Sequence, residues 1–414
     1  MSKKSPQLRF EGFTDDWEER KLGEITTSYS GGTPSAGNSS YYKGDIPFIR
    51  SGEINSSKTE LFLTEEGFNN SSAKLVEVGD ILYALYGATS GEVGISQING
   101  AINQAILAIK PIEGYESQFI MQWLKLQKQK IIGKYLQGGQ GNLSGTIVKD
   151  LFLRIPDSKE QKKIGQFFKQ LDDTIALHQR KLDLLKEQKK GYLQKMFPKN
   201  GAKVPELRFA GFADDWEERK LSDVANHRGG TAIEKYFDKD GEYKVISIGS
   251  YGLNSQYVDQ NIRAISNEIT DGRVVNSGEL TMVLNDKTAN GTIIGRTLLV
   301  EKDNEYVINQ RTEIISPKEN FDSNFAYTIL NGPFREKVKR IVQGGTQIYV
   351  NYPAVSNLNL ELPKIEEQQK IGSFFKQLDD TIALHQRKLD LLKEQKKGFL
   401  QKMVLLQSFP SDPL

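Results

Sequence analysis

Polar side chains that can hydrogen-bond to base edges are the part of this sequence best suited to do chemistry. Arg, Lys, Asn and Gln form paired hydrogen bonds with bases, and Ser, Thr and Tyr add single ones. Such residues gather between apolar runs in two long regions, 23–156 and 222–363, which we call the first and second bodies. We predict that they contact DNA. In the first body they are Arg50, Lys58, Tyr86, Thr89, Ser90, Gln104, Gln140, Asn142 and Ser144, and in the second they are Arg228, Lys235, Tyr251, Asn285, Lys287, Asn290, Arg296, Arg311, Gln347 and Tyr349.

Catalytic signatures are missing from the sequence. No GxxxxGK[ST] phosphate loop occurs, which argues against nucleotide hydrolysis at a site of that kind. With three histidines and no cysteine, no nucleophile triad can be assembled and a zinc site is not expected. The segment Asn351-Tyr352-Pro353 has the wrong residue order for an amino-methyltransferase motif, and Asp157 and Glu160 are too close together for a metal nuclease. We therefore predict no catalytic residue and no metal ligand.

A nearly exact internal repeat organises the chain. Residues 164–196 recur as 371–403 with only two differences in 33 positions, and 6–22 recur as 205–221 with 14 of 17 positions kept. Because outward-facing charged positions are copied as well, either the duplication is recent or both copies present the same surface to the same partner. The bodies between these repeats share almost nothing, which indicates one scaffold that holds two different binding domains.

The long repeat has the heptad pattern of a coiled-coil helix. Apolar positions alternate by three and four from residue 168 to 196, and again from 375 to 403. Each helix needs a partner, and an antiparallel pairing with its own copy is the simplest arrangement. The 29 residues of one copy would span roughly 43 Å at about 1.5 Å per residue. The predicted seam consists of Phe168, Leu171, Ile175, His178, Leu182, Leu185, Phe375, Leu378, Ile382, His385, Leu389 and Leu392, in which the histidines are expected to be hydrogen-bonded and to set the register.

The bodies are predicted to be mixed α+β. Strand-like runs occur at 45–50, 79–85 and 101–110, followed by a helix over 117–135 and a polar loop over 137–145. Matching segments recur in the second body at an offset of 199 near Gly278 and of 206 near Ile308, which predicts seven inserted residues between them. We expect the same fold with different loops.

The composition of the chain limits the number of domains and the cellular compartment that we expect. The chain has 414 residues, enough for two or three domains, and a formal net charge of +2. Basic charge is concentrated in residues 151–204, with 13 Lys and Arg against 6 Asp and Glu. The absence of cysteine, signal peptide and long apolar stretch predicts a cytoplasmic protein that does not contact a membrane.

Several short motifs lie along essentially the whole sequence. They are Asp15-Asp16-Trp17-Glu18, Ser30-Gly31-Gly32-Thr33-Pro34, Ile46-Pro47-Phe48-Ile49, Gly79-Asp80-Ile81-Leu82, Ala101-Ile102-Asn103-Gln104, and the Ile155-Pro156 and Leu362-Pro363 pairs before the long helices. Through these motifs and their double arrangement, the chain resembles the specificity subunits of type I restriction-modification systems, the HsdS family. Residues 228–231 depart from the family pattern because they lack the proline of the first copy.

The resemblance implies two target-recognition domains, each reading one half of a bipartite sequence in double-stranded DNA. It also implies that the helices set the spacer and dock two copies of a methylation subunit, and that a restriction or translocase subunit completes the assembly. S-adenosylmethionine, ATP and Mg²⁺ are then expected on those partners, with no cofactor on this chain. Two alternatives are open: a self-contained methyltransferase–nuclease enzyme, and a coiled-coil protein scaffold without DNA readout.

The predicted fold class is α+β, with two mixed α/β recognition domains separated by two long antiparallel helices in pseudo-twofold symmetry. The last helix should return near the N-terminal block. The predicted parts are an N-terminal repeat block (1–22), recognition domain 1 (23–156), the central helix and linker (157–204), a second repeat block (205–221), recognition domain 2 (222–363), the distal helix (364–403) and a tail of no assigned role (404–414).

Overall fold

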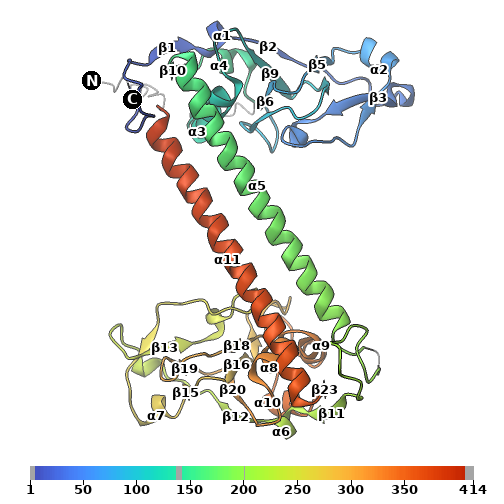
Figure 1. The fold of residues 1–414 in the computed structure, drawn as a ribbon, viewed down its shortest axis with the longest axis vertical. Coiled ribbons are helices and arrows are strands. Elements are labelled where there is room, and N and C mark those ends of the chain that lie inside the picture. Colours follow the sequence, from blue (N-terminus) through green and yellow to red (C-terminus); the bar gives the residue numbers. More distant parts are fainter. Residues whose placement is uncertain (1–4, 137–141, 200, 406–414) are drawn as a thin grey trace. The chain divides into compact units, whose positions relative to one another are not determined.

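The computed structural model describes residues 5–136, 142–199 and 201–405 and divides the chain into two compact units (Figure 1). The first unit contains residues 1–179 and 387–414, and the second contains residues 180–386. Each unit therefore combines one body with a part of both long helices. The domain boundaries given above fall at the ends of the repeats and not within the helices, and they remain predictions.

The first unit contains two four-stranded sheets. Strands β2, β9, β6 and β7 form an antiparallel sheet, whereas the sheet β4-β3-β8-β5 has one parallel pair, β3 with β8. A two-stranded pair, β1 with β10, lies at the entry to the long helix. The elements are β1 (Glu18–Lys21), α1 (Leu22–Ile25), β2 (Thr26–Ser30), η1 (Ser39–Tyr41), β3 (Tyr42–Ile49), η2 (Ser51–Glu53), β4 (Phe62–Leu63), α2 (Glu65–Asn69), β5 (Lys74–Val76), β6 (Ile81–Ala84), β7 (Val93–Ile95), β8 (Gly100–Ile102), β9 (Ile106–Pro111), α3 (Ser117–Tyr135), α4 (Gly145–Lys149), β10 (Phe152–Ile155) and α5 (Ser158–Lys195).

The second unit repeats this topology. Its sheets are β12-β20-β16-β18 and β14-β13-β19-β15, again with one parallel pair, and β11 pairs with β23. It adds a small sheet, β17-β22-β21. The elements are β11 (Glu217–Lys220), α6 (Leu221–Val224), β12 (Ala225–Gly229), η3 (Glu234–Tyr236), β13 (Tyr243–Ile246), η4 (Ile248–Ser250), β14 (Arg263–Ala264), α7 (Glu268–Asp271), β15 (Val274–Val275), β16 (Leu280–Val283), β17 (Asn285–Asp286), β18 (Thr297–Leu299), β19 (Tyr306–Ile308), β20 (Thr312–Pro317), α8 (Ser323–Asn331), α9 (Pro333–Lys339), β21 (Gln343–Gly344), β22 (Ile348–Tyr349), α10 (Tyr352–Ser356), β23 (Asn359–Leu362) and α11 (Ile365–Met403).

One local prediction needs correction. The run 101–110 is not one strand: a turn separates β8 from β9, because the Asn103 side chain accepts a hydrogen bond from the Ala105 amide and the Asn103 carbonyl accepts one from the Ile106 amide. The central helix begins at Ser158, ten residues before the heptad pattern starts. Asp157 accepts hydrogen bonds from the amides of Lys159 and Glu160, so this carboxylate caps the helix.

The predicted antiparallel pairing of α5 with α11 is present inside each unit. In the first unit Phe167 packs edge-on against Phe399, at a ring-centroid distance of 5.3 Å. In the second unit the equivalent contact joins Tyr192 and Phe374 at 5.0 Å. In both pairs a residue near the start of one long helix meets a residue near the end of the other, as antiparallel packing requires.

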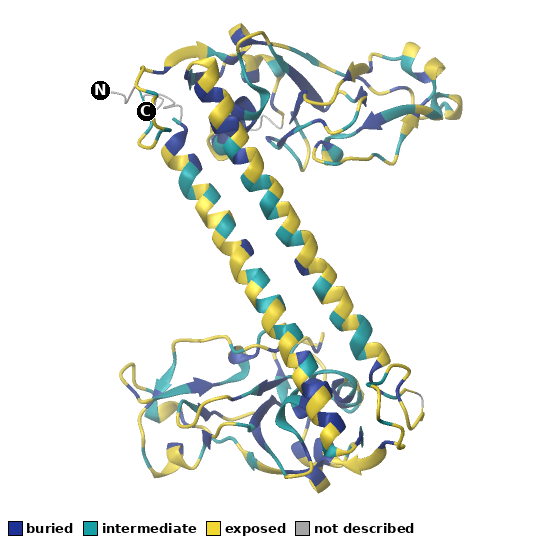
Figure 2. Cartoon of the chain, in the orientation of Figure 1, coloured by how far each residue is buried: buried dark blue, intermediate teal, exposed yellow. Residues whose placement is uncertain are grey.

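The predicted seam positions are the less exposed positions of the two helices (Figure 2). Phe168, Leu182, Phe375 and Leu389 are buried, each with at most 1% of its surface exposed. The remaining eight seam residues are half-buried, among them the two histidines. The heptad pattern therefore identified the inward-facing stripe of both helices.

The repeat blocks fold onto the first turns of the long helices through a buried ion pair. The guanidinium of Arg9 forms two hydrogen bonds with the Glu160 carboxylate, at 2.9 and 2.6 Å, and Arg208 forms two with Glu367, both at 2.7 Å. Both glutamates are buried. Removing one partner of such a pair costs about 3–5 kcal/mol, because the other charge is left uncompensated in the core.

The N-terminal block also contacts the end of the last helix, as the repeat order predicts. The Leu8 amide donates to the Lys402 carbonyl at 2.9 Å, and in the second unit the Leu207 amide donates to the Lys195 carbonyl at 2.8 Å. The tail that had no assigned role begins by covering the core of the first unit. Val404 is buried, and the Trp123 indole donates to the Leu405 carbonyl at 3.2 Å. Within the described ranges, no helix is long and apolar enough to cross a membrane.

Candidate nucleic-acid interface

Three loops meet at the end of strand β6 in the first unit, and three equivalent loops meet at the end of β16 in the second. Leu85 donates its amide to the Ala105 carbonyl and accepts a hydrogen bond from the Leu143 amide, at 2.8 and 2.9 Å. Leu284 makes the same two bonds with Arg311 and Val350, at 3.0 and 2.9 Å. We call the three segments of each unit its loop cluster. They are 85–91, 103–105 and 142–144 in the first unit, and 284–295, 309–311 and 343–350 in the second.

The two loop clusters present the same pair of side-chain types in exchanged positions. In the first, Tyr86 bridges to Asn142, and in the second the equivalent bridge joins Asn285 to Tyr349. The backbone pairing is therefore preserved while the phenol and the carboxamide change places. Both groups can hydrogen-bond to base edges, so one backbone presents a different donor and acceptor pattern in each unit.

Most of the inserted residues of the second body lie in its loop cluster. The Ala84 amide donates to the Glu92 carbonyl, and the Val283 amide donates to the Arg296 carbonyl. Ala84 and Val283 are 199 positions apart, whereas Glu92 and Arg296 are 204 apart, so the loop after β16 contains five additional residues. The predicted insertion is thus located, and its greater part extends a surface loop.

The glycine pair of the first-body motif is explained by a close backbone approach. A Cβ atom on Gly31 would lie 1.8 Å from the Ile102 carbonyl oxygen, and one on Gly230 would lie 2.0 Å from the Asn309 carbonyl oxygen. The Asn-Gln motif lies on the other side of this contact. In the second unit the Asn309 carboxamide accepts from the Ile233 amide and donates to Glu234. These bonds connect residues 233 and 234 to the 309–311 segment of the second loop cluster.

The structure brings most of the predicted DNA-contacting residues into the loop clusters. Their roles remain predictions. Gln140 lies outside the described residues. Those with exposed side chains in the clusters are Gln104, Asn142, Lys287, Asn290, Arg311, Gln347 and Tyr349, and Ser144, which caps α4, is exposed at the cluster's edge. Those that are half-buried are Tyr86, Thr89, Ser90, Asn285 and, directly after its cluster, Arg296.

Two predicted arginines lie outside the clusters in ion pairs. Arg50 binds Glu53 and Glu60 through Nη2, both at 2.9 Å. Burial opposes ionisation of Glu53, but hydrogen bonds from Arg50 and from backbone amides lower the pKa of Glu53 to about 2. Arg228 donates to both oxygens of Glu279, at 3.0 and 2.8 Å. These guanidinium groups hold loops and strands together within their own units.

The remaining candidates outside the clusters differ in exposure. Lys58 and Lys235 are exposed, and the Lys235 ammonium lies 4.7 Å from the centroid of the Tyr236 ring. Tyr251, by contrast, is 4% exposed and donates its hydroxyl to Thr281 at 2.9 Å. The structure places Tyr251 in the core, among buried residues from both four-stranded sheets of the second unit.

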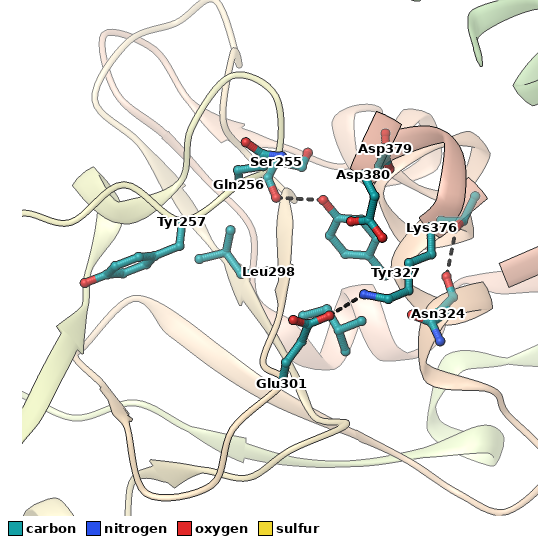
Figure 3. A pocket seen from close by; sticks show the side chains of 12 residues that line it. Ser255, Gln256, Tyr257, Leu298, Glu301, Asn324, Tyr327, Lys376, Asp379 and Asp380 are labelled. Atoms are coloured by element: carbon teal, nitrogen blue, oxygen red, sulfur yellow. Dashed lines mark hydrogen bonds and ion pairs between the residues drawn. The ribbon is translucent and has the colours of Figure 1, made fainter. Parts of the chain in front are cut away.

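Arg296 is turned toward its own unit. It donates to the Thr292 carbonyl and to the Ser255 hydroxyl, both at 2.9 Å. Ser255 forms part of the wall of a hollow between residues 255–257, strand β18 and helices α8 and α11 (Figure 3). The Tyr327 hydroxyl donates to the Ser255 carbonyl across this wall, at 2.8 Å. The bonds from Arg296 to Thr292 and Ser255 use guanidinium donors that a base contact by Arg296 would need.

Sequence reasoning missed two buried charged residues that contact the second loop cluster, one on α9 and one within the cluster itself. Arg335 is 7% exposed and Asp286 is 3% exposed. Each of them hydrogen-bonds to backbone groups of the inserted loop. Neither residue lies in a recognisable motif. The only signal in the sequence was the charge itself, an arginine within the apolar pattern of residues 325–338.

Within the described ranges, no group of three or more His, Cys, Asp or Glu is arranged to hold a metal ion.

Comparison with known proteins identifies the two bodies and their helices. A family model for the type I restriction modification DNA specificity domain matches residues 14–187 and, a second time, residues 213–394. The chain belongs to this family. Residues 14–187 and 213–394 are hereafter its first and second specificity domains, and each contains one loop cluster. The resemblance noted in the sequence is thereby confirmed.

Individual relatives match the chain over different lengths. The MjaVIII type I restriction enzyme specificity subunit from Methanocaldococcus jannaschii is 21% identical over 401 residues, covering 93% of this chain and 91% of that protein. The HindI specificity subunit from Haemophilus influenzae is 27% identical over 177 residues, covering 41% of this chain and 37% of that protein. The crystal structure of the S subunit from M. genitalium has the same fold, with a TM-score of 0.68 at 13% identity, covering 98% of this chain and all of that one.

Proposed function

We propose that this chain is the DNA specificity subunit of a type I restriction-modification complex. Each specificity domain would read one half of a bipartite target in double-stranded DNA, through its loop cluster. The observation that carries this proposal is that both domains keep one backbone arrangement at the cluster while exchanging its side chains, Tyr86 and Asn142 against Asn285 and Tyr349. Variation confined to surface loops on a constant scaffold is how binding sites are diversified.

The long helices would dock the methylation subunit. Leu177 and Leu184 on α5 are 62% and 57% exposed, and Leu384 and Leu391 on α11 are 65% and 53% exposed. In each helix the two leucines are seven positions apart and therefore lie on one face. Among the residues that the structure describes, none of these four leucines belongs to a buried apolar cluster. Because both helices present the same stripe, we expect one copy of the methylation subunit on each.

This chain would supply the DNA sequence specificity, and its partner subunits would carry out catalysis. Methylation of adenine needs S-adenosylmethionine, and translocation and cleavage need ATP and Mg²⁺. We assign these cofactors to the methylation subunit and to a restriction or translocase subunit. The complex would then be an endonuclease and methyltransferase in which this chain has no catalytic residue. The alternative, a protein scaffold without DNA readout, would use the leucine stripes and leave the loop clusters without a ligand.

Binding selection on random duplex DNA separates these two functions. The chain is co-purified with its methylation subunit, and the complex is used to select fragments from a randomised pool. The proposal predicts one enriched motif made of two short half-sites around an unspecified spacer. A complex that forms normally but enriches no sequence would contradict the proposal and favour the scaffold. A single undivided motif would contradict the assignment of one half-site to each domain.

A further inference from the structure

The inserted loop of the second specificity domain is held by a buried arginine, Arg335. The residue at the equivalent place in the first domain makes different contacts. Arg335, on α9, donates to three loop carbonyls: Gly291 at 3.0 Å, Thr292 at 2.8 Å and Ile294 at 2.9 Å. None of the hydrogen bonds described for its guanidinium goes to a carboxylate. A buried charge is costly unless it is fully hydrogen-bonded, so these carbonyls are the groups that stabilise it.

The loop is held from its other end by Asp286. The buried carboxylate accepts hydrogen bonds from the Thr288 amide at 3.0 Å and the Ile293 amide at 2.9 Å. The base of the loop is thus fixed by two buried ionic groups, while the four residues at its tip, 287–290, are exposed. Two of those four, Lys287 and Asn290, are among the predicted DNA contacts. A fixed base with an exposed polar tip is the geometry that pre-organised recognition requires.

The first domain handles the same positions differently. Gly91 and Gly295 are equivalent: each donates its amide to the strand residue before its loop, Ala84 or Val283, at 2.9 Å. A Cβ atom on Gly91 would meet Lys128, and one on Gly295 would meet Arg335 and Val338. Lys128 is therefore the structural counterpart of Arg335.

The partner of this cation has also changed. In the first domain Lys128 forms an ion pair with Glu92, which follows the short loop. In the second domain the residue equivalent to Glu92 is Arg296, so the acidic partner has been replaced by a second cation. Proximity of Arg296 adds to burial in lowering the pKa of Arg335 to about 10, which leaves Arg335 charged at neutral pH. Three carbonyls of the longer loop thus take the place of a carboxylate.

We propose that Arg335 is a positioning residue that sets the base specificity of the second domain by fixing the inserted loop. The proposal rests on the proposed function, because it assigns the loop tip to the half-site that this domain reads. The loop and Arg335 form one unit: the insertion supplies the acceptors that the cation needs, and the cation gives the insertion one conformation. Arg296 contributes by donating to the same Thr292 carbonyl that accepts from Arg335.

Four variants of the complex with the methylation subunit test this inference. Arg335→Met keeps much of the side-chain volume and removes every donor to the loop. Arg296→Glu recreates the acidic partner found in the first domain, so the new carboxylate should draw Arg335 away from the carbonyls without leaving a charge unpaired. Lys128→Met is the matched control in the first domain. Tyr349→Ala identifies which half-site belongs to the second domain.

Two readouts are needed. The first is hydrogen exchange at the amides of Thr288 and Ile293, which reports whether the loop is fixed, and it does not depend on DNA. The second is selection on duplexes randomised at either half-site. For Arg335→Met and Arg296→Glu we expect faster exchange at both amides, and a loss of roughly tenfold or more in base discrimination at the second domain's half-site. Discrimination at the other half-site should be unchanged, and Lys128→Met should leave the second half-site as in the wild type.

The outcomes are distinguishable. Unchanged exchange in folded Arg335→Met would overturn the positioning role. Faster exchange with wild-type discrimination would show that the loop does not determine specificity, and would overturn the inference as well. An equal loss at both half-sites would indicate general damage to the protein and count against it. If the wild-type complex selects no motif at all, the proposed function fails and the inference fails with it, whereas a wild-type motif with an insensitive Arg335→Met variant removes the inference alone.

Discussion

The Lys396 ammonium lies 2.5 Å from the Oδ1 atom of Asp172, which joins α11 to α5 within the first unit. In the second unit Lys189 makes the same contact with Asp379, also at 2.5 Å. Lys189 and Lys396 are 207 positions apart, as are Asp172 and Asp379. Each copy of the duplicated helix therefore supplies the lysine of one ion pair and the aspartate of the other. The two equivalent pairs support the same antiparallel register.

Removal of these carboxylates should have unequal effects. Asp172 also accepts a hydrogen bond from the buried Gln122 side chain at 2.8 Å, so Asp172→Ala leaves both a lysine and a buried carboxamide without this partner. We expect Asp172→Ala to lower the free energy of unfolding by about 2 kcal/mol. Asp379→Ala, which removes a half-exposed ion pair, should lower it by about 1 kcal/mol. Urea unfolding followed by circular dichroism measures both, and equal losses would show that the Gln122 contact contributes nothing.

A seam leucine and an outward leucine two positions apart should separate stability from partner binding. Leu182 is 1% exposed and Leu184 is 57% exposed. Leu182→Asp places a charge in the seam and should cost about 3 kcal/mol or more in unfolding free energy. Leu184→Asp should leave the melting temperature nearly unchanged but weaken binding of the methylation subunit, measured by analytical ultracentrifugation. If Leu184→Asp and Leu391→Asp both bind the methylation subunit as tightly as the wild type, the exposed leucines are not its docking surface.

Glu53 should make stability depend on pH in the acid range. Its pKa in the folded chain is about 2, below the ordinary value of 4.5, so ionised Glu53 stabilises the fold above pH 4.5. This contribution is lost as the pH falls from 4.5 toward 2. Because its partner Arg50 is 41% exposed and screened by solvent, we expect the loss to be about 1 kcal/mol. The difference in unfolding free energy between wild type and Glu53→Gln should therefore shrink over that range, and a constant difference would contradict the assignment.

The exchanged pair predicts domain-specific effects on DNA selection. Tyr349→Ala should weaken discrimination at one half-site, and Asn142→Ala at the other, each by roughly tenfold. Neither should change the spacer, because neither residue lies on a long helix. Selection on half-site libraries measures this directly. If both variants altered the same half-site, the assignment of one loop cluster to each half would be wrong.

The repeat and its periodicity made the helices predictable. The near identity of the two repeats predicted that the long helices pair with each other. The spacing of three and four between apolar residues predicted the seam, because the face that a helix buries follows from its local sequence. The heptad pattern begins only at Phe168, because the first ten residues of α5 and the cap Asp157 lie outside it, in a segment considered for metal binding. In the structure its neighbour Glu160 is the buried partner of Arg9.

The loop clusters were predictable only in part. Polar loop composition pointed to Tyr86, Asn142, Asn285 and Tyr349, but their pairing depends on bridges between segments about 60 residues apart. The same composition included Tyr251, which packs in the core. Arg335 was missed because its acceptors are backbone carbonyls, which leave no trace in the residue types of the loop.

The most direct test of the account is single-molecule methylation sequencing of genomic DNA from cells with and without the gene for this chain. We predict that deletion removes adenine methylation from one split motif and leaves other methylated motifs unchanged. Restoring the gene with Tyr349→Ala should return methylation with one half of the motif relaxed. A methylome that does not change on deletion, in cells where the chain is expressed together with its methylation subunit, would contradict the role of this protein in DNA specificity.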